Sequence, residues 1–186
     1  MEILKTRTFI AINLPLEVKN KLSQIQEKIK KECGQKNIKW VSPQNFHFTL
    51  HFLGYLTAKE IDLVKNILKQ TLNNQSLEII LKIKEKNCFP HLKRARVMFF
   101  AGEEKKGNLK KLQKKIGQKL KTKGFKIDER PWKIHLTWAR AINPLNFPDS
   151  FKKIQELEFK VDSIDLMKSE LRRSGPIYTI LEKYPL

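Results

Sequence analysis

The stretch from Phe46 to Gly54, FHFTLHFLG, alternates between apolar and polar residues. Phenylalanine and leucine fill every second position through Phe52, and His47, Thr49 and His51 fill the positions between them. A two-residue period is typical of a half-buried strand, because successive side chains point to opposite faces of a sheet. The pattern therefore predicts a strand with one face in a core and one face that presents two imidazoles and a hydroxyl.

The same arrangement returns in PWKIHLTWARA, residues 131–141, where His135 and Thr137 lie between apolar residues. One such H-x-T triplet is weak evidence, since a lone histidine on a strand more often makes a structural hydrogen bond. However, the chain has only four histidines, and two of them begin an H-x-T triplet on the polar face of a predicted strand. The repeat indicates that the two strands act together.

The order of the predicted elements also repeats between the two halves of the chain. Alternating stretches predict strands at residues 6–14, 46–54, 76–85, 95–102, 131–141, 157–171 and 176–183. Apolar stripes of helical spacing predict helices that contain residues 18–29, 61–72 and 109–120. Thr57 and Glu60 have the capping-box spacing before the second helix. No Gly/Ser-rich linker separates the halves, so we expect one domain, residues 1–186, with two packed lobes of roughly residues 1–90 and 91–186.

Composition narrows the partners and the compartment. The 38 Lys and Arg against 19 Asp and Glu give a net charge of +19, which attracts polyanions such as nucleic acid, although lysine-rich helices fit a solvated surface equally well. No apolar run is long enough to cross a bilayer, and the first residues do not resemble a signal peptide, so we expect a cytoplasmic protein without membrane contact. Cys33 and Cys88 form no CxxC pair, which argues against a zinc site and a disulfide framework.

Two imidazoles and two hydroxyls brought together suit a phosphodiester. Because histidine has a pKa near 6.5, one ring can be neutral and the other protonated, which supplies a general base and a general acid. The threonine hydroxyls can donate hydrogen bonds to phosphate oxygens as charge develops. No carboxylate cluster has metal-ligand spacing, so we expect neither a metal nor another cofactor. Arg140 lies in the opposite register from His135; a bulge could bring its guanidinium onto the phosphate, but on spacing alone a surface arginine is as plausible.

These residues resemble the paired H-x-T motifs of the two-histidine phosphoesterase superfamily, and specifically the RNA 2′,3′-cyclic phosphodiesterases, also called 2′-5′ RNA ligases. The likeness covers nearly the whole chain, including RTFIAINLP at the start, the FP turn at 89–90 and SELRRSGPIYTILEKYPL at the end. The resemblance implies an α+β bilobal fold, with two pseudo-symmetric antiparallel sheets around a central groove and helices packed outside. It also implies hydrolysis of a terminal 2′,3′-cyclic phosphate to a 2′-phosphate.

The resemblance also assigns roles to residues of this chain. His47 matches the proton donor to the leaving 3′ oxygen, and His135 matches the acceptor that activates water. Thr49 and Thr137 match the phosphate-contacting threonines, and Arg140 matches a basic position that touches the phosphate. Near-symmetry leaves the acid and base roles of the two histidines exchangeable on geometry alone.

Four residues fall outside the family motif. Ile134 stands where the family often has proline and Trp138 where it usually has leucine, and both lie in the apolar register. His51 shares the polar register of His47, which places it on the site face, where it could line the edge of the groove and contact RNA; a polar residue at the end of the strand is the simpler interpretation. His91 follows the Phe-Pro turn, where a surface loop residue is expected.

Three other functions remain open on the sequence. Joining a cyclic-phosphate end to a 5′-hydroxyl uses the same in-line chemistry, with an RNA hydroxyl in place of water. A catalytically silent RNA-binding module is less consistent with a matched acid and base. Small cyclic nucleotides could also be substrates, although the positive charge favours a longer anion. The expected partner is RNA with 2′,3′-cyclic phosphate ends, tRNA fragments included, and we expect a monomer.

Overall fold

The computed structural model describes residues 4–33, 37–73, 77–173 and 175–186. Its helices are α1 (Leu16–Cys33), α2 (Ala58–Leu72) and α3 (Asn108–Thr122). Its strands are β1 (Thr6–Asn13), β2 (Ile38–Trp40), β3 (His47–Leu56), β4 (Ile80–Phe89), β5 (Ala95–Glu103), β6 (His135–Leu145), β7 (Lys153–Lys160), β8 (Ser163–Arg172) and β9 (Gly175–Pro185). Within the described ranges, no helix is both long and apolar enough to cross a membrane.

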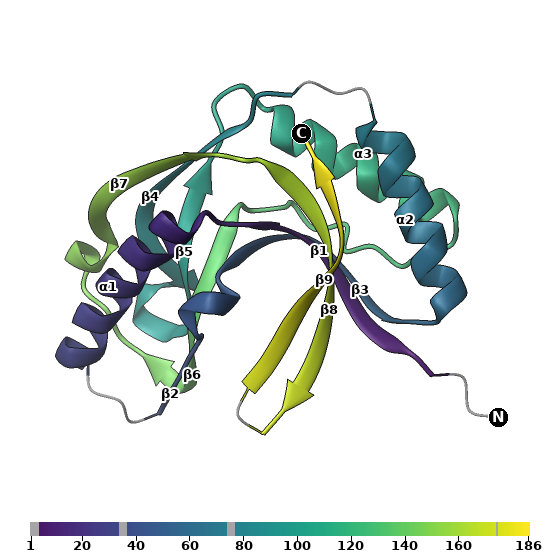
Figure 1. The fold of residues 1–186 in the computed structure, drawn as a ribbon. Helices are drawn as coiled ribbons and strands as arrows, with labels where there is room; N and C mark the ends of the chain where they lie inside the picture. Colours follow the sequence, from purple (N-terminus) through teal and green to yellow (C-terminus); the bar gives the residue numbers. More distant parts are fainter. Residues whose placement is uncertain (1–3, 34–36, 74–76, 174) are drawn as a thin grey trace.

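The strands form two antiparallel sheets. The four-stranded sheet has the order β3-β1-β8-β9, and the five-stranded sheet has the order β2-β6-β5-β4-β7. In Figure 1, α1 lies beside the five-stranded sheet, and α2 and α3 cover the outer side of the four-stranded sheet. The predicted α+β class, with two antiparallel sheets and helices outside, is therefore confirmed.

The two sheets do not correspond to residues 1–90 and 91–186, so the lobe boundary expected from the sequence is wrong. The four-stranded sheet joins β1 and β3 to β8 and β9, and the five-stranded sheet joins β2 and β4 to β5, β6 and β7. The β-α-β repeat is present as β1-α1-β3 and β5-α3-β6. Each helix, however, packs on the sheet that contains the other copy of the repeat. Gln26 of α1 donates a hydrogen bond to the Trp138 carbonyl of β6, and α3 contacts β3. Element order fixes neither the sheet that a strand joins nor the face that a helix covers.

The change of sheet also divides one predicted strand. Residues 157–171 were expected to be continuous, but β7 ends at Lys160 and β8 begins at Ser163. Phe159 pairs with Leu81 in the five-stranded sheet, whereas Ser163 pairs with Pro185 in the four-stranded sheet. The chain therefore passes from one sheet to the other between these strands, and the alternation of side chains does not reveal that crossing.

Local signals account for the helices. The capping box of α2 is confirmed: the Glu60 amide donates to Thr57 Oγ1 at 3.3 Å, and the Thr57 amide donates to Glu60 Oε2 at 2.7 Å. Each of the predicted stripe residues of α3 is buried: Leu109, Leu112, Ile116 and Leu120. Gly34 follows the predicted helical stripe of residues 18–29, where a glycine typically ends a helix, but it lies outside the described residues. One continuous cluster of buried side chains extends across both sheets and their helices.

Candidate active site

Two β-bulges lie at matching places in the strands that begin with His47 and His135. In β3, Thr49 pairs with Ala11 and His51 pairs with Ile10, so Leu50 is an extra residue. In β6, Thr137 pairs with Phe99 and Ala139 pairs with Met98, so Trp138 is an extra residue. Each bulge begins three residues after its histidine and reverses the alternation of side chains beyond it.

The bulge at Trp138 decides the position of Arg140. Trp138 and Ala139 are both fully buried, so the next residue, Arg140, returns to the face that carries His135 and Thr137. Arg140 is exposed there. From the sequence, Arg140 could reach the face of His135 only if β6 contained a bulge. The structure contains that bulge, at Trp138.

The bulge at Leu50 has the opposite effect on His51, and the expectation that His51 shares the site face is wrong. Leu50 and His51 are 3% and 5% exposed on the core side, whereas Phe52 is 59% exposed on the face of His47. The His51 Nε2 donates to the Gln113 carbonyl of α3 at 2.8 Å. Phe52 thus occupies in β3 the place that Arg140 occupies in β6.

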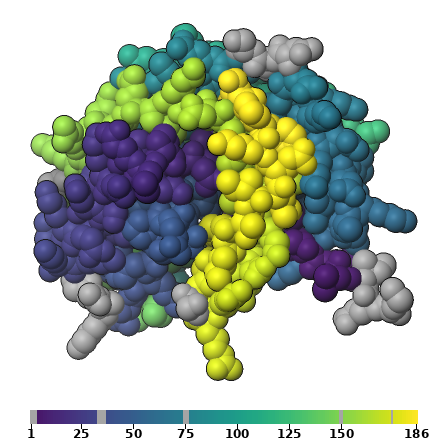
Figure 2. Space-filling view, viewed as in Figure 1, coloured from purple at the N-terminus to yellow at the C-terminus, as the bar shows by residue number. Residues whose placement is uncertain are grey.

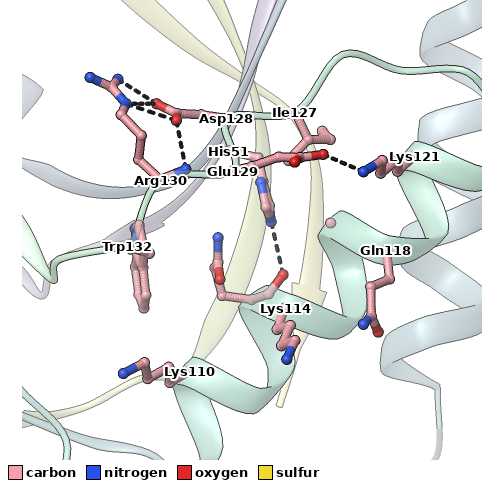
Figure 3. A pocket seen from close by; sticks show the side chains of 12 residues that line it. His51, Lys110, Lys114, Gln118, Lys121, Ile127, Asp128, Glu129, Arg130 and Trp132 are labelled. Atoms are coloured by element: carbon pink, nitrogen blue, oxygen red, sulfur yellow. Dashed lines mark hydrogen bonds and ion pairs between the residues drawn. The ribbon is translucent and has the colours of Figure 1, made fainter.

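His51 borders a cavity of about 350 Å³ on the helix-covered side of the four-stranded sheet (Figure 3). Its rim carries two ion pairs, Arg130 with Asp128 and Lys121 with Glu129. Burial lowers the pKa of His51, although its hydrogen bond to the Gln113 carbonyl acts in the opposite direction. The residues that line this cavity include neither His47 nor His135, so it is separate from the paired histidines.

The His47 imidazole is held from several sides. Its Nδ1 lies 2.7 Å from the Asn45 carbonyl oxygen, and its Nε2 lies 3.0 Å from Thr49 Oγ1. The rings of Phe9 and Tyr178 contact it, with centroid distances of 5.0 and 5.2 Å. Four neighbours therefore fix both the position and the rotation of this ring.

The His135 imidazole has a matching environment. Its Nδ1 lies 2.8 Å from the carbonyl oxygen of Lys133. The rings of Phe89 and Phe99 contact it edge-on, at centroid distances of 5.4 and 5.6 Å, and they stack on each other at 4.3 Å. In both strands, then, a carbonyl two residues earlier and two aromatic rings hold the histidine.

The carbonyl contacts define the tautomer of each ring. A carbonyl oxygen can only accept a hydrogen bond, so Nδ1 of His47 and of His135 carries the hydrogen. In the neutral ring, Nε2 is then the nitrogen without a proton and the one that can act as a base. In the protonated ring, Nε2 becomes a donor. Each imidazole thus presents the same nitrogen for proton transfer.

The surroundings of His47 disfavour its protonated form. Burial is the main cause that lowers the pKa of His47 to about 4, and the positive charges of Lys19 and His135 lower it further. The hydrogen bond to the Asn45 carbonyl raises it but does not compensate. At neutral pH the His47 ring is therefore neutral, with Nε2 available as an acceptor.

Side chains from both sheets meet at Tyr178 of β9. Its ring contacts His47 of the four-stranded sheet. The charge of Arg140, from the five-stranded sheet, acts on its phenol and lowers the phenol's pKa, against the larger effect of burial. The strands β3 and β6 also contact each other directly. The two histidine strands thus lie in contact, and we call their five predicted residues the inter-sheet site: His47, Thr49, His135, Thr137 and Arg140. Figure 2 shows the yellow β8–β9 hairpin beside the blue surface of residues near 40, with its tip projecting beyond that surface.

A close approach behind His135 gives a first prediction. The Gly102 amide donates to the Ile134 carbonyl at 2.8 Å, and a Cβ on Gly102 would lie 2.5 Å from Ile134 Cγ2 and 3.1 Å from Phe48 Cε1. Gly102→Ala must displace Ile134, which directly precedes His135. We expect a loss of about 1–3 kcal/mol in the free energy of unfolding, measured by chemical denaturation.

The companion variant for this test is Ile134→Ala. Because it removes the methyl group that an alanine at 102 would meet, the double variant should lose less stability than the sum of the two single variants. Additive losses would show that the contact with Ile134 is not the cause.

The comparison with known proteins agrees with this geometry. The family model described as LigT like Phosphoesterase matches residues 12–99 and 101–178. The chain belongs to the LigT-like phosphoesterases. This LigT-like phosphoesterase is 31% identical to the RNA 2′,3′-cyclic phosphodiesterase of Methanothermobacter thermautotrophicus, over 98% of this chain and 100% of that protein. It is 33% identical to the RNA 2′,3′-cyclic phosphodiesterase of Methanocaldococcus jannaschii, over 96% and 99%.

Among solved structures, that of TT0787 of Thermus thermophilus matches this LigT-like phosphoesterase with a TM-score of 0.80. The two sequences are 28% identical, and the match covers 97% of each chain. The family resemblance predicted from the paired H-x-T strands is therefore confirmed over nearly the full length.

Several residues that shape the site of this LigT-like phosphoesterase were not singled out by the sequence. Asn45 and Lys133 act through backbone carbonyls, which carry no side-chain signal, although both lie two residues before a histidine. Phe9 and Tyr178 are apolar or aromatic residues of other strands, and only the tertiary structure places them against His47. In the described parts of the chain, no three His, Cys, Asp or Glu side chains are grouped in a way that could hold a metal ion.

Proposed function

We propose that this protein hydrolyses RNA 2′,3′-cyclic phosphate ends to 2′-phosphomonoesters by paired histidine acid–base catalysis without a metal ion. The observation that carries the proposal is the matched pair of imidazoles, each with Nδ1 held by a carbonyl and Nε2 left as the nitrogen for proton transfer. The names of the relatives support the substrate, since both relatives compared above are RNA 2′,3′-cyclic phosphodiesterases.

In the proposed reaction, water attacks the phosphorus of the cyclic phosphate in line with the 3′ oxygen. His135 Nε2 accepts a proton from the attacking water, and the new P–O bond forms as the bond from phosphorus to the 3′ oxygen breaks. His47, in its protonated form, donates the Nε2 proton to the leaving 3′ oxygen. The phosphate remains on the 2′ oxygen, and the two histidines exchange protonation states in each turnover.

The remaining site residues stabilise the charge that develops on the phosphate. We assign hydrogen bonds from the Thr49 and Thr137 hydroxyls to the non-bridging oxygens, where charge accumulates in the transition state. The Thr49 hydroxyl already lies 3.0 Å from His47 Nε2, so the two groups border the same small volume. Arg140 has a planar fork of donors that can bind two phosphate oxygens at once.

The test is to incubate the protein and EDTA with a short RNA that ends in a 2′,3′-cyclic phosphate, and to identify the new end group by mass spectrometry and nuclease digestion. We expect a 2′-phosphate. A 3′-phosphate would mean that the 2′ oxygen leaves instead, and an unchanged cyclic end in EDTA, with turnover restored by a divalent ion, would contradict the metal-independent mechanism.

Ligation is tested in the same reaction by adding an RNA with a 5′-hydroxyl. That hydroxyl can replace water in the in-line attack, so a joined product with a 2′-5′ bond would add ligase activity to the proposal. If wild type bound the RNA without any reaction, the silent RNA-binding module would replace the enzyme.

The proposed setting is a monomer that acts on RNA in the cytoplasm, with tRNA fragments among its substrates. All five residues of the inter-sheet site belong to one chain, so the proposed chemistry needs no second copy. The net charge of +19 favours a long polyanion over a small uncharged ligand.

A further inference from the structure

Arg7 lies on the same face of β1 as the aromatic residues that hold His47. Phe9 and Ala11 form a small apolar cluster with Met167, separate from the main core, and Tyr178 packs against that cluster. Since side chains alternate along a strand, Arg7 falls in the register of Phe9 and Ala11. This places a guanidinium on the inter-sheet side of the four-stranded sheet.

The contacts of Arg7 fix its position relative to Tyr178. Its Nη1 donates to Ser169 Oγ at 2.9 Å, and Ser169 is the residue of β8 that pairs with Tyr178 of β9. The charges of Arg7 and Arg140 both act on the Tyr178 phenol and lower its pKa, against the larger opposite effect of burial. Tyr178 therefore has a cation from each sheet near its hydroxyl.

Arg7 has no acidic partner among the ion pairs of the described residues. Arg130 pairs with Asp128, and Arg172 pairs with Glu170. Arg7, which is half-buried, shares its lack of an acidic partner among these pairs with Arg94, Arg96, Arg140 and Arg173, of which only Arg140 belongs to the inter-sheet site. Hydrogen bonding to a neutral hydroxyl leaves the charge of Arg7 uncompensated. An uncompensated guanidinium on this face favours an anionic ligand.

The rings of Phe9 and Tyr178 lie between Arg7 and the His47 imidazole, and both contact that imidazole. On β1, the partner of His47 is Asn13, six residues from Arg7, which corresponds to roughly 20 Å along an extended strand. Tyr178 lies in the space between Arg7 and His47, because its ring contacts His47 and the charge of Arg7 acts on its phenol. A phosphate bound by Arg7, on the far side of these rings from His47, therefore belongs to another part of the substrate.

We propose that Arg7 binds an internal phosphodiester of the RNA, on the 5′ side of the nucleotide that carries the cyclic phosphate. This inference rests on the proposed function and deepens it, because it names oligonucleotide ends, and not free cyclic mononucleotides, as the preferred substrate. Arg140 and the two threonines then hold the reacting phosphate, and Arg7 holds the chain that leads to it. The guanidinium fork can engage both non-bridging oxygens of that phosphodiester while Ser169 keeps the side chain oriented.

The test compares Arg7→Gln with wild type on two substrates: a 2′,3′-cyclic mononucleotide with a 5′-hydroxyl, and an RNA trinucleotide with a 2′,3′-cyclic end. Only the trinucleotide has internal phosphodiesters. We expect Arg7→Gln to lower kcat/KM for the trinucleotide about tenfold or more, through KM, and to change the value for the mononucleotide less than about twofold. The dependence of log KM on log salt for the trinucleotide should also weaken by about one contact.

Two further variants make the comparison specific. Arg130→Gln makes the same change of charge beside the cavity on the helix-covered side, and it should leave both substrates unaffected. Arg7→Lys keeps the charge but loses the fork, so it should show an intermediate loss on the trinucleotide alone. Equal losses on both substrates would overturn the proposal, since they would indicate an effect on the reacting phosphate or on folding. Equal rates for wild type and Arg7→Gln on the trinucleotide would overturn it as well.

A binding measurement separates this proposal from the proposed function. Affinity for a trinucleotide that already ends in a 2′-phosphate can be measured by calorimetry whether or not the protein turns over the cyclic form. If wild type hydrolyses neither substrate, the proposed function fails. Arg7 is then judged by binding alone: tenfold weaker binding by Arg7→Gln supports the phosphodiester contact, and unchanged binding overturns it.

Discussion

His47→Ala and His135→Ala should each lower kcat for a cyclic-phosphate RNA end by about 10²- to 10⁴-fold, the range expected for the loss of a positioned general acid or base. The reason is that each ring offers one nitrogen, Nε2, whose protonation state the structure defines through the carbonyl bound to Nδ1. Two aromatic rings also hold each imidazole in place, so its removal leaves no positioned group that can transfer the proton. Steady-state kinetics on a cyclic-end oligonucleotide measure the loss.

The matched control is His91→Ala. His91 is exposed and lies just after the Phe89–Pro90 turn, and its replacement should leave kcat unchanged within about twofold. The double variant of His47 and His135 should lose little more than either single variant, because residues that act as a unit are not additive. If either single variant kept activity within a few-fold of wild type, paired histidine catalysis would be wrong.

The sequence predicted the local structure and the chemistry of the two histidine strands well. Strict alternation around His47 and His135 indicated strands with a polar face, and both histidines begin strands in the structure. The capping box at Thr57 and Glu60 predicted the start of α2 correctly. These features depend on neighbouring residues only, so a single sequence contains the information that they need.

Features that depend on pairing between distant strands could not be predicted in the same way. A bulge inserts one residue opposite a partner strand, and the sequence around Leu50 gives no sign that Thr49 and His51 pair with adjacent residues of β1. His51 was for this reason placed on the wrong face, and Arg140 could not be placed at all without the bulge at Trp138. The same limit explains the lobe boundary, because strand order in a sheet is a tertiary property.

The near-symmetry of the two histidine strands does not decide which of His47 and His135 is the acid and which is the base. The pKa of His47 is lowered to about 4, so at pH 7 nearly every His47 ring is neutral. That state suits an acceptor, whereas the family resemblance makes His47 the donor. The two statements agree only if the substrate itself changes the protonation of His47.

A phosphate anion in the inter-sheet site should make that change. A negative charge at hydrogen-bond distance favours the imidazolium, whereas the causes that now lower the pKa are burial and the positive charges of Lys19 and His135. We expect NMR titration of the imidazole resonances to show the pKa of His47 rising from about 4 to above roughly 6 when a nucleotide 2′-phosphate is added. His51 provides an internal control, because it lies on the other side of the sheet against Gln113 and its pKa should not move.

The direction of this shift decides the roles of the two rings. The lowered pKa of His47 means that its Nε2 proton is absent above about pH 4, and a raised pKa in the complex extends its protonated range towards neutrality. If His47 gains the proton when the phosphate binds, it is the donor to the 3′ oxygen and His135 is the base. If His47 stays neutral and the proton appears on His135, the roles are exchanged. Because both rings present Nε2 from the same carbonyl-held geometry, electrostatics and not shape makes the choice.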